Sequence, residues 1–330
     1  MKGLNLLKQT VAYKLIESDR RANALCHAYL VISQDGKYLR DTLKEFAKII
    51  MAGSVGGYFG GEVEDQRVFA LIDSEKFVDA TFIPEEDKKV TVADIDLLIA
   101  DSIVKPFEAD KRLFVLCLNE PMSPDAQNKL LKTLEEPPEN VYILIGALNE
   151  TAILPTIKSR VRKLTIPPYS DQELISELSP YCVDEERLAL AVASSDGTVG
   201  DAERLYEDRE LIGHYSLAKE IICKMKESKD VLAYSVKLNY LKDKLDEFID
   251  VLELVFKDLL EGVTAGEKYV KNLSLYRELD KTGLSAGALV GILSKISETK
   301  KRRKANANDV MVADFILYGI LEEKYKWQKL

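Results

Sequence analysis

The residues best suited to phosphate chemistry are Gly36 and Lys37, in the stretch 33–41 (SQDGKYLRD). A working phosphate loop needs a glycine-rich turn whose backbone N–H groups cradle phosphate, a lysine for the outer phosphates, and a Ser or Thr hydroxyl for magnesium. Here Tyr38 follows the lysine directly, and a tyrosine cannot supply a small hydroxyl ligand at that place. We therefore interpret Lys37 as a solvated loop lysine rather than a phosphate ligand.

Imidazole and thiol chemistry have little raw material in this chain. Two histidines, His27 and His214, are too few for a histidine-based metal site or catalytic triad. The four cysteines lie far apart, without the two-to-four-residue spacing of a zinc knuckle. They are Cys26, Cys117, Cys182 and Cys223. We expect buried, reduced thiols, no metal ion, and neither hydrolase nor metalloenzyme chemistry.

Charge and composition limit the class of protein. The 330 residues have a formal net charge of -9, so any contact with DNA must be local or shared with partners. Hydrophobic residues make up 46% and charged residues 31%, as in globular proteins, and the length predicts two or three domains. Residues 1–5 lack a secretory pattern and no apolar run reaches spanning length, so we expect a cytoplasmic protein without a membrane partner.

The elements that would position these residues follow two patterns. The first half alternates short β-rich runs with helical patterns, which predicts an α/β fold with a parallel sheet covered by helices on both faces. Residues 113–118 and 141–145 are apolar at successive positions, as in central strands. Between them Ser123 and Pro124 form a helix start. We expect strands at residues 28–33, 68–73, 112–118 and 141–147.

Helical signals dominate after Pro167 and Pro168. Ser170 and Glu173 have the spacing of a capping box, and no convincing strand pattern follows. Apolar residues at three-and-four spacing run along 245–259, and stripes at 289–296 and 310–321 complete a helical bundle. The five glycines in residues 53–61 favour a loop.

Two segments have the spacing of a known family. Residues 130–138 (LLKTLEEPP) are followed, after one expected strand, by residues 154–160 (LPTIKSR). Together they resemble bacterial clamp-loader subunits of the AAA+ P-loop NTPase class, in which the first motif follows the Walker B strand and the second ends in a Ser-Arg pair. Val161 stands where the family usually has cysteine. Further matches are residues 27–30 (HAYL), 105–108 (KPFE) and, more weakly, 196–200 (DGTVG) and 306–308 (NAN).

This resemblance implies an ATP site that has lost its working parts. Aligned on residues 27–30, Leu39 falls where the family lysine belongs, Tyr38 replaces the preceding glycine, and Arg40 replaces the magnesium-binding hydroxyl. Cys117 and Leu118 stand where the Walker B carboxylates should end the strand. Gly200 occupies the place of the sensor arginine of motor subunits. The degenerate loop, Ser33, Gly36, Tyr38, Leu39 and Arg40, is expected to bind no cofactor.

The same losses separate the delta-prime type of subunit from its ATP-hydrolysing tau or gamma paralogue. The family's usual zinc-binding cysteines are also missing between Met51 and Arg67. The resemblance implies a non-catalytic stator of bacterial DNA polymerase III, without ATPase or polymerase activity of its own. A tau- or gamma-like ATPase and an AAA+-shaped adaptor of another assembly are the alternatives. Saturable ATP binding favours the first, and failure to assemble with clamp-loader partners favours the second.

Ser159 and Arg160 match the pair from which clamp-loader subunits insert an arginine into a neighbour's nucleotide site. We hypothesise that Arg160 acts in trans as an arginine finger, because a guanidinium at the γ-phosphate stabilises the charge of the transition state. The alternative is that Arg160 pairs with a carboxylate at the sheet edge.

The resemblance also implies an organisation and partners. We expect an AAA+-like domain at 1–167, a helical lid at 168–208, and a helical collar at 209–330. The collar would join tau or gamma and delta subunits in a complex that places the sliding clamp on primed DNA, with no small-molecule substrate of its own. Lys129 and Lys132 are candidates for contact with DNA. The basic run 300–304 is another candidate, although we favour a solvated turn between collar helices.

Overall fold

A computed structural model describes residues 2–55, 61–85, 88–241, 244–267, 270, 273–305 and 307–328. Their contacts form two compact units, Met1–Tyr181 with Asp196–Asp201, and Cys182–Ser195 with Ala202–Leu330. This grouping places pieces of the 168–208 segment in both units. The division into three regions stays a prediction.

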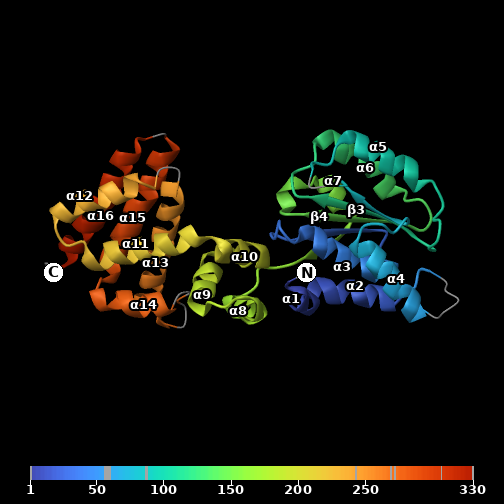
Figure 1. Ribbon diagram of the computed structural model, residues 1–330. Helices are drawn as coiled ribbons and strands as arrows, with labels where there is room; N and C mark the ends of the chain where they lie inside the picture. Colours follow the sequence, from blue (N-terminus) through green and yellow to red (C-terminus); the bar gives the residue numbers. More distant parts are fainter. Residues whose placement is uncertain are drawn as a thin grey trace. The chain divides into compact units, whose positions relative to one another are not determined.

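A fully parallel five-stranded sheet forms the centre of the first unit (Figure 1). Its strands are β1 (Ala28–Ile32), β2 (Ala80–Ile83), β3 (Arg112–Leu118), β4 (Val141–Ala147) and β5 (Arg162–Thr165). The strand order is β2-β3-β4-β1-β5. Strands β1, β3 and β4 each have two neighbours, which confirms the prediction that the most apolar runs are central strands.

Helices cover both faces of this sheet, as predicted. Alternate residues of β1 enter two different cores, Tyr29 and Val31 on one face and Leu30 and Ile32 on the other. Figure 1 shows the helices of each face on opposite sides of the strands. The first group is α2 (Val11–Arg21), α3 (Leu39–Met51) and α4 (Gly61–Asp73), and the second is α5 (Val92–Ser102), α6 (Pro124–Glu135) and α7 (Pro155–Lys158).

One predicted strand is wrong. Residues 68–73 are the end of α4, in which Val68 and Ile72 are buried one helical turn apart. The strand beside β3 is instead the four-residue β2, and β5 was missed because Leu164 is its single buried residue. The glycine-rich segment cannot be compared fully, since residues 56–60 lie outside the described residues.

Predicted helix starts are confirmed at two positions. Ser123 Oγ accepts a hydrogen bond from Ala126 N at 3.3 Å, with Pro124 in the first position of α6. Ser170 and Glu173 form the predicted capping box. The other helices before residue 208 are α1 (Leu4–Gln9), η1 (Glu150–Ala152), α8 (Asp171–Leu178), η2 (Ser179–Tyr181), α9 (Glu185–Ser194) and α10 (Val199–Glu207).

The second unit is a helical bundle, as predicted. Within it α13 packs against α11 and α15, and α16 packs against α15 and α12. Phe248, Leu252 and Phe256 on α13 are fully buried in the shared core. Val310, from one predicted stripe, is instead exposed. The helices are α11 (Arg209–Lys224), α12 (Ser228–Asn239), α13 (Leu245–Ala265), α14 (Leu273–Leu279), η5 (Asp280–Thr282), α15 (Ala286–Lys304) and α16 (Asp309–Gln328).

The basic run 300–304 belongs to the end of α15, so the predicted turn is wrong, although Lys301, Arg302 and Lys304 are exposed to solvent as expected. Lys300 Nζ lies 2.6 Å from Asp250 Oδ1, and Arg303 Nε lies 2.8 Å from Asp246 Oδ1. Both carboxylates belong to α13. These cations therefore join two helices, at a helix end whose dipole also favours positive charge.

Candidate functional site

The degenerate loop lies where parallel α/β sheets bind ligands, at the carboxyl ends of the strands. Residues 33–38 connect β1 to α3, with Ser33 buried and Gly36 exposed. Lys37 is exposed, with Nζ 5.5 Å from the centre of the Tyr38 ring. Leu39 is fully buried in the core between the sheet and helices α2, α3 and α4. A leucine held there cannot reach or neutralise a phosphate.

Arg40 belongs to an ion-pair cluster. Its Nε and Nη2 donate to the two carboxylate oxygens of Glu75 at 2.7 and 2.5 Å, and Lys44 Nζ lies 2.9 Å from Glu75 Oε1. Burial would raise the pKa of Glu75, but hydrogen bonds from Arg40 and Lys44 outweigh it and hold that pKa below its ordinary value. Arg40, which the resemblance aligns with the magnesium-binding hydroxyl, thus joins α3 to the residues that follow α4. The sequence reasoning missed Glu75.

Asp35, which the sequence reasoning also missed, fills the loop with a carboxylate. The residue is 9% exposed. Oδ1 accepts a hydrogen bond from Tyr38 N at 3.0 Å, and Oδ2 accepts one from Gly200 N at 2.9 Å. Burial raises the pKa of Asp35, and these backbone N–H groups partly oppose the rise. An N–H group at the start of α3, of the kind that binds phosphate elsewhere, is therefore already occupied.

The space beside the loop is small. Its volume is about 20 Å³, and Ser33, Asp35 and Thr42 line it together with Gly197 and Thr198. Small-molecule sites usually enclose roughly 300–1,000 Å³, whereas a space of about 10–15 Å³ holds one water. This space accommodates about one water.

The carboxyl end of β3 offers no acidic metal ligand. Cys117 and Leu118 are each 3% exposed, Asn119 follows, and Glu120 is exposed beyond the strand. Among the described residues there is also no cluster of three or more potential metal ligands. The part of the chain that the structure describes contains no helix long and apolar enough to cross a membrane.

Arg160 lies at the opposite end of the sheet from the loop. Residues 159 and 160 are separated from the start of β5 by Val161, while the loop directly follows β1, and the register pairs Tyr29 with Arg162 and Ile32 with Thr165. Because β1 and β5 are adjacent and parallel, the C-terminal end of β1 and the N-terminal end of β5 lie at opposite ends of the strands. Arg160 is thus placed away from its own chain's nucleotide loop.

The local contacts of Arg160 are known in detail. Nη2 lies 2.5 Å from Glu135 Oε1, and Nη1 donates to Thr156 O at 2.8 Å and to Ser159 Oγ at 3.1 Å. The Arg160 side chain remains 33% exposed. The predicted alternative, a carboxylate partner, is therefore present in this chain, and the carboxylate is Glu135 of the 130–138 motif. Such a partly exposed pair is weak enough to be exchanged for another anion.

Gln127, missed by the sequence reasoning, joins the two family motifs. Its Nε2 donates to Met122 O and Ala152 O, both at 3.0 Å, and Leu154 N donates to its Oε1 at 2.8 Å. The side chain is 3% exposed. It holds the start of the 154–160 motif against α6, which positions Arg160 through the backbone.

The 105–108 motif is explained by Asp79, a buried residue that the sequence reasoning passed over. Its carboxylate accepts hydrogen bonds from the backbone N–H groups of Phe107, Glu108 and Ala109 at 2.7–2.8 Å. Asp79 has no exposed surface, and its partners satisfy the buried charge. The motif therefore shapes the turn that leads into β3.

The two candidate DNA-facing lysines differ. Lys129 Nζ lies 2.6 Å from Asp96 Oδ1 of α5, so its charge is partly neutralised. Lys132 is exposed on the same helix. A contact with DNA stays a prediction for both residues, with Lys132 the better placed because its charge faces solvent.

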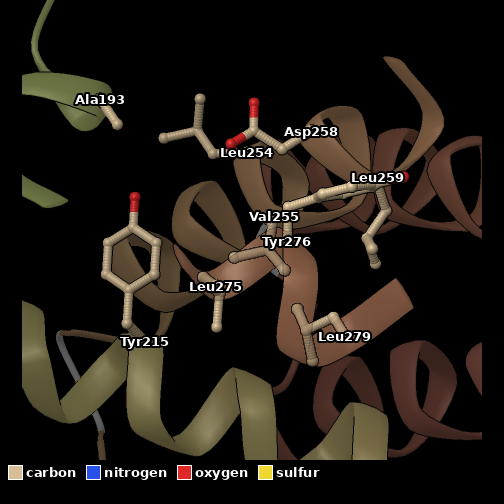
Figure 2. Close-up of a pocket in the computed structure, with 9 residues that line it drawn as sticks. All are labelled: Ala193, Tyr215, Leu254, Val255, Asp258, Leu259, Leu275, Tyr276 and Leu279. Atoms are coloured by element: carbon tan, nitrogen blue, oxygen red, sulfur yellow. The ribbon is translucent and has the colours of Figure 1, made fainter. Parts of the chain in front are cut away.

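A second small cavity lies in the helical bundle (Figure 2). It has a volume of about 10 Å³, room for at most one water. Tyr215 Oη is hydrogen-bonded to Ser194 Oγ, and burial raises the pKa of Tyr215 to about 12, so the phenol is neutral at pH 7. We interpret it as a packing void. Its lining residues are Ala193, Tyr215, Leu254, Val255, Asp258, Leu259, Leu275, Tyr276 and Leu279.

Sequence comparisons agree on one family. Residues 8–170 match the family model described as DNA polymerase III, delta subunit. Over 305 residues the chain is 23% identical to DNA polymerase III subunit delta' of Bacillus subtilis, which covers 90% of each chain. It is 32% identical over 112 residues to DNA polymerase III subunit delta' of Escherichia coli, which covers 34% of this chain and 30% of that protein.

Solved structures similar to the chain include two replication proteins. One is a DNA polymerase III gamma subunit-related protein of Thermotoga maritima, with a TM-score of 0.44, 18% identity, and coverage of 94% and 99%. The other is the clamp loader delta protein of Bacillus subtilis, with a TM-score of 0.35, 13% identity, and coverage of 94% and 100%.

The parallel sheet in this strand order, with helices on both faces and a helical bundle after it, is an AAA+-like architecture of the clamp-loader kind. Within this class, the chain belongs to the family of bacterial DNA polymerase III delta-prime subunits. The predicted fold class and family are thereby confirmed.

Proposed function

We propose that this chain is the stator of a bacterial clamp loader, which binds no ATP itself and offers Arg160 to a neighbouring ATPase subunit. The observation that carries the proposal is the position of Arg160, which lies at the N-terminal ends of the strands, whereas the degenerate loop lies at their C-terminal ends. An arginine at that end of the strands can contact a nucleotide bound by another subunit, but not a nucleotide bound by its own loop.

The state of the loop supports the first half of the proposal. The lysine position is the buried Leu39, the hydroxyl position is the ion-paired Arg40, and the adjoining cavity is about 20 Å³. Each difference removes a different interaction that a triphosphate needs. No single substitution would therefore restore ATP binding.

The contacts of Arg160 support the second half. In the isolated chain its guanidinium is held by Glu135 and by the end of α7, so its direction is set before assembly. A γ-phosphate carries more negative charge than a carboxylate and binds a planar guanidinium in two places. Docking against a neighbour's ATP would therefore replace Glu135 with phosphate.

The partners of such a stator are the tau or gamma and delta subunits, joined through the helical bundle, with the sliding clamp and primed DNA in the working complex. Family membership supports these partners, since the related proteins of B. subtilis and E. coli are named DNA polymerase III subunits. The bacterial cytoplasm, where replication takes place, is the compartment that this role implies.

The test is Arg160→Ala in a reconstituted clamp loader, measured as DNA-stimulated ATP hydrolysis. We expect the site that Arg160 serves to lose on the order of 10³-fold or more in rate, because arginine fingers contribute about 10³- to 10⁵-fold. The total rate falls by that site's share. Arg160→Lys should rescue little, since an ammonium lacks the planar fork.

The matched control is Arg21→Ala, which removes an exposed arginine paired with Glu17 on α2. It should leave hydrolysis unchanged. Each of the three variants, Arg160→Ala, Arg160→Lys and Arg21→Ala, must form a complex of the same mass as the native protein does. Full DNA-stimulated ATPase with Arg160→Ala in a complete complex would falsify the role of the arginine.

A further inference from the structure

The carboxylate of Asp35 joins two segments that are distant in the chain. Its bond to Gly200 N spans 165 positions and links loop 33–38 to segment 196–201, both in the first unit. Tyr38 N precedes α3, and Gly200 N lies in the first turn of α10. Two helix N-termini thus point toward one buried carboxylate, an arrangement that suits an anion at this place.

The fit around this carboxylate excludes any side chain at position 200. A Cβ atom added to Gly200 would lie 2.3 Å from Asp35 Oδ1 and 2.7 Å from Lys37 Cβ. Segment 196–201 is held at a second point, where Tyr169 N donates to Gly197 O at 2.8 Å. Gly197 has a φ of +75°, which favours glycine there. The glycines permit the close approach, and Asp35 supplies the charge.

We infer that Asp35 is a built-in replacement for a bound phosphate, which latches segment 196–201 to the degenerate loop without any nucleotide. The inference goes beyond the proposed function, because it concerns the isolated chain and holds whether or not Arg160 acts on a neighbour. A site closed by a diffusing ligand opens when the ligand leaves, whereas a site closed by its own side chain stays closed. This device suits a subunit that keeps one conformation throughout a reaction cycle.

The first test is amide hydrogen exchange in the full-length protein with Asp35→Ala. Loss of a charged hydrogen bond should speed exchange at Gly200 and Tyr38 roughly 10- to 100-fold relative to the native chain. Asp41→Ala is the matched control, since it removes a nearby carboxylate from the first turn of α3. It should leave exchange at Gly200 unchanged.

The second test adds inorganic pyrophosphate to the same variant. Removing the Asp35 carboxylate leaves the two N–H groups facing an empty space, so pyrophosphate should slow exchange at Gly200 in Asp35→Ala and should have no effect on the native protein. If Asp35→Ala does not fold, Asp35→Asn, whose side chain keeps the shape but has one acceptor oxygen for the two N–H groups, is used for the first test, and Asp35→Ser, which is smaller and uncharged, is used with pyrophosphate.

The outcomes separate the two parts of the inference. Unchanged exchange at Gly200 in Asp35→Ala, or at both Gly200 and Tyr38 in Asp35→Asn, would overturn the latch. Faster exchange that pyrophosphate does not reverse would overturn the replacement of phosphate and leave a simple structural bond. Neither result depends on ATP hydrolysis by the assembled complex, so the proposed function is judged separately.

Discussion

The charge states of several ionisable side chains in this chain depend on neighbouring protein groups rather than on solvent alone. Arg40 and Lys44 share Glu75, Asp35 accepts hydrogen bonds from backbone N–H groups of two segments, and Lys324 of α16 is partly buried against the end of α11. In each case burial alone would disfavour the charge, and hydrogen bonds compensate to a different degree. The stability of the protein should therefore depend on pH at identifiable positions.

Glu75→Gln should destabilise the first unit by about 1–3 kcal/mol at pH 7, because Arg40 and Lys44 lose a partly buried partner. The native pKa of Glu75 lies below its ordinary value, so its contribution is present above about pH 4.5 and is lost as pH falls through the lowered pKa. Urea unfolding at several pH values measures the difference. Glu17→Gln, at an exposed pair, is the control, and an effect of Glu75→Gln that persists undiminished at acid pH contradicts this account.

Lys324 should give the second unit an unusual pH dependence. Its Nζ donates to Ile222 O at 2.6 Å and Met225 O at 3.3 Å, and burial lowers its pKa to about 8. Between about pH 8 and the ordinary lysine pKa the unfolded chain binds more protons, so stability should rise with pH by up to about 1.4 kcal/mol per unit. Lys324→Met should abolish this slope, and the exposed Lys326→Met should retain it. Equal slopes in both variants between pH 8 and 9.5 would rule out Lys324 as the cause.

At the scale of elements, the helical bundle depends on α13. Its apolar stripe is buried by α11 and α15, and ion pairs from the last turn of α15 fix the register of these helices. The same logic applies to α6 and α7, which Gln127 joins across two motifs. Elements that the sequence separates are held together by a few buried groups.

Leu252→Ala should destabilise the bundle by about 2–5 kcal/mol, because Leu252 is fully buried on α13 and its truncation leaves a cavity. The matched control is Leu232→Ala on α12, where the side chain is 72% exposed and the expected change is within about 0.5 kcal/mol. Thermal unfolding by circular dichroism measures both. Similar losses in the two variants would show that α13 is not central to the core.

At the scale of the whole molecule, the parallel sheet places the degenerate loop and Arg160 at opposite ends of its strands. The loop at the carboxyl ends of the strands is closed by Asp35, while Arg160 lies before β5 at the other edge. Under the proposed function, a chain of this design would contribute to hydrolysis without a nucleotide of its own, and only within an assembly.

The isolated protein should show no saturable binding of magnesium ATP in a calorimetric titration up to millimolar nucleotide. The physical reasons are the missing lysine, the missing hydroxyl and the cavity of about 20 Å³. An ATPase subunit of the same family, titrated in parallel, provides the positive control. Tight, magnesium-dependent uptake by the isolated chain would instead favour an unusual ATPase.

Much of the fold could be predicted because its causes are local. Continuous apolar runs marked β3 and β4, and Ser123, Pro124 and Ser170 marked helix starts, since periodicity and capping act within a few residues. Short elements escaped this reasoning: the apolar run 68–73 fits strand or helix, and β5 has one buried residue. The motifs around Arg160 were recognised by their resemblance to those of clamp-loader subunits, in residue types and in spacing.

The sequence by itself determined the family, the predicted loss of the ATP-site residues and the candidacy of Arg160, because these follow from a resemblance that particular side chains at particular spacings carry. Tertiary structure alone decided that Glu135 holds Arg160, that Glu75 binds Arg40, and that Asp35 reaches Gly200. Hydrogen bonds and ion pairs act over about 3 Å, whereas these partners are separated by tens of residues or more along the chain. Only the packing of the sheet and its helices brings them within that distance.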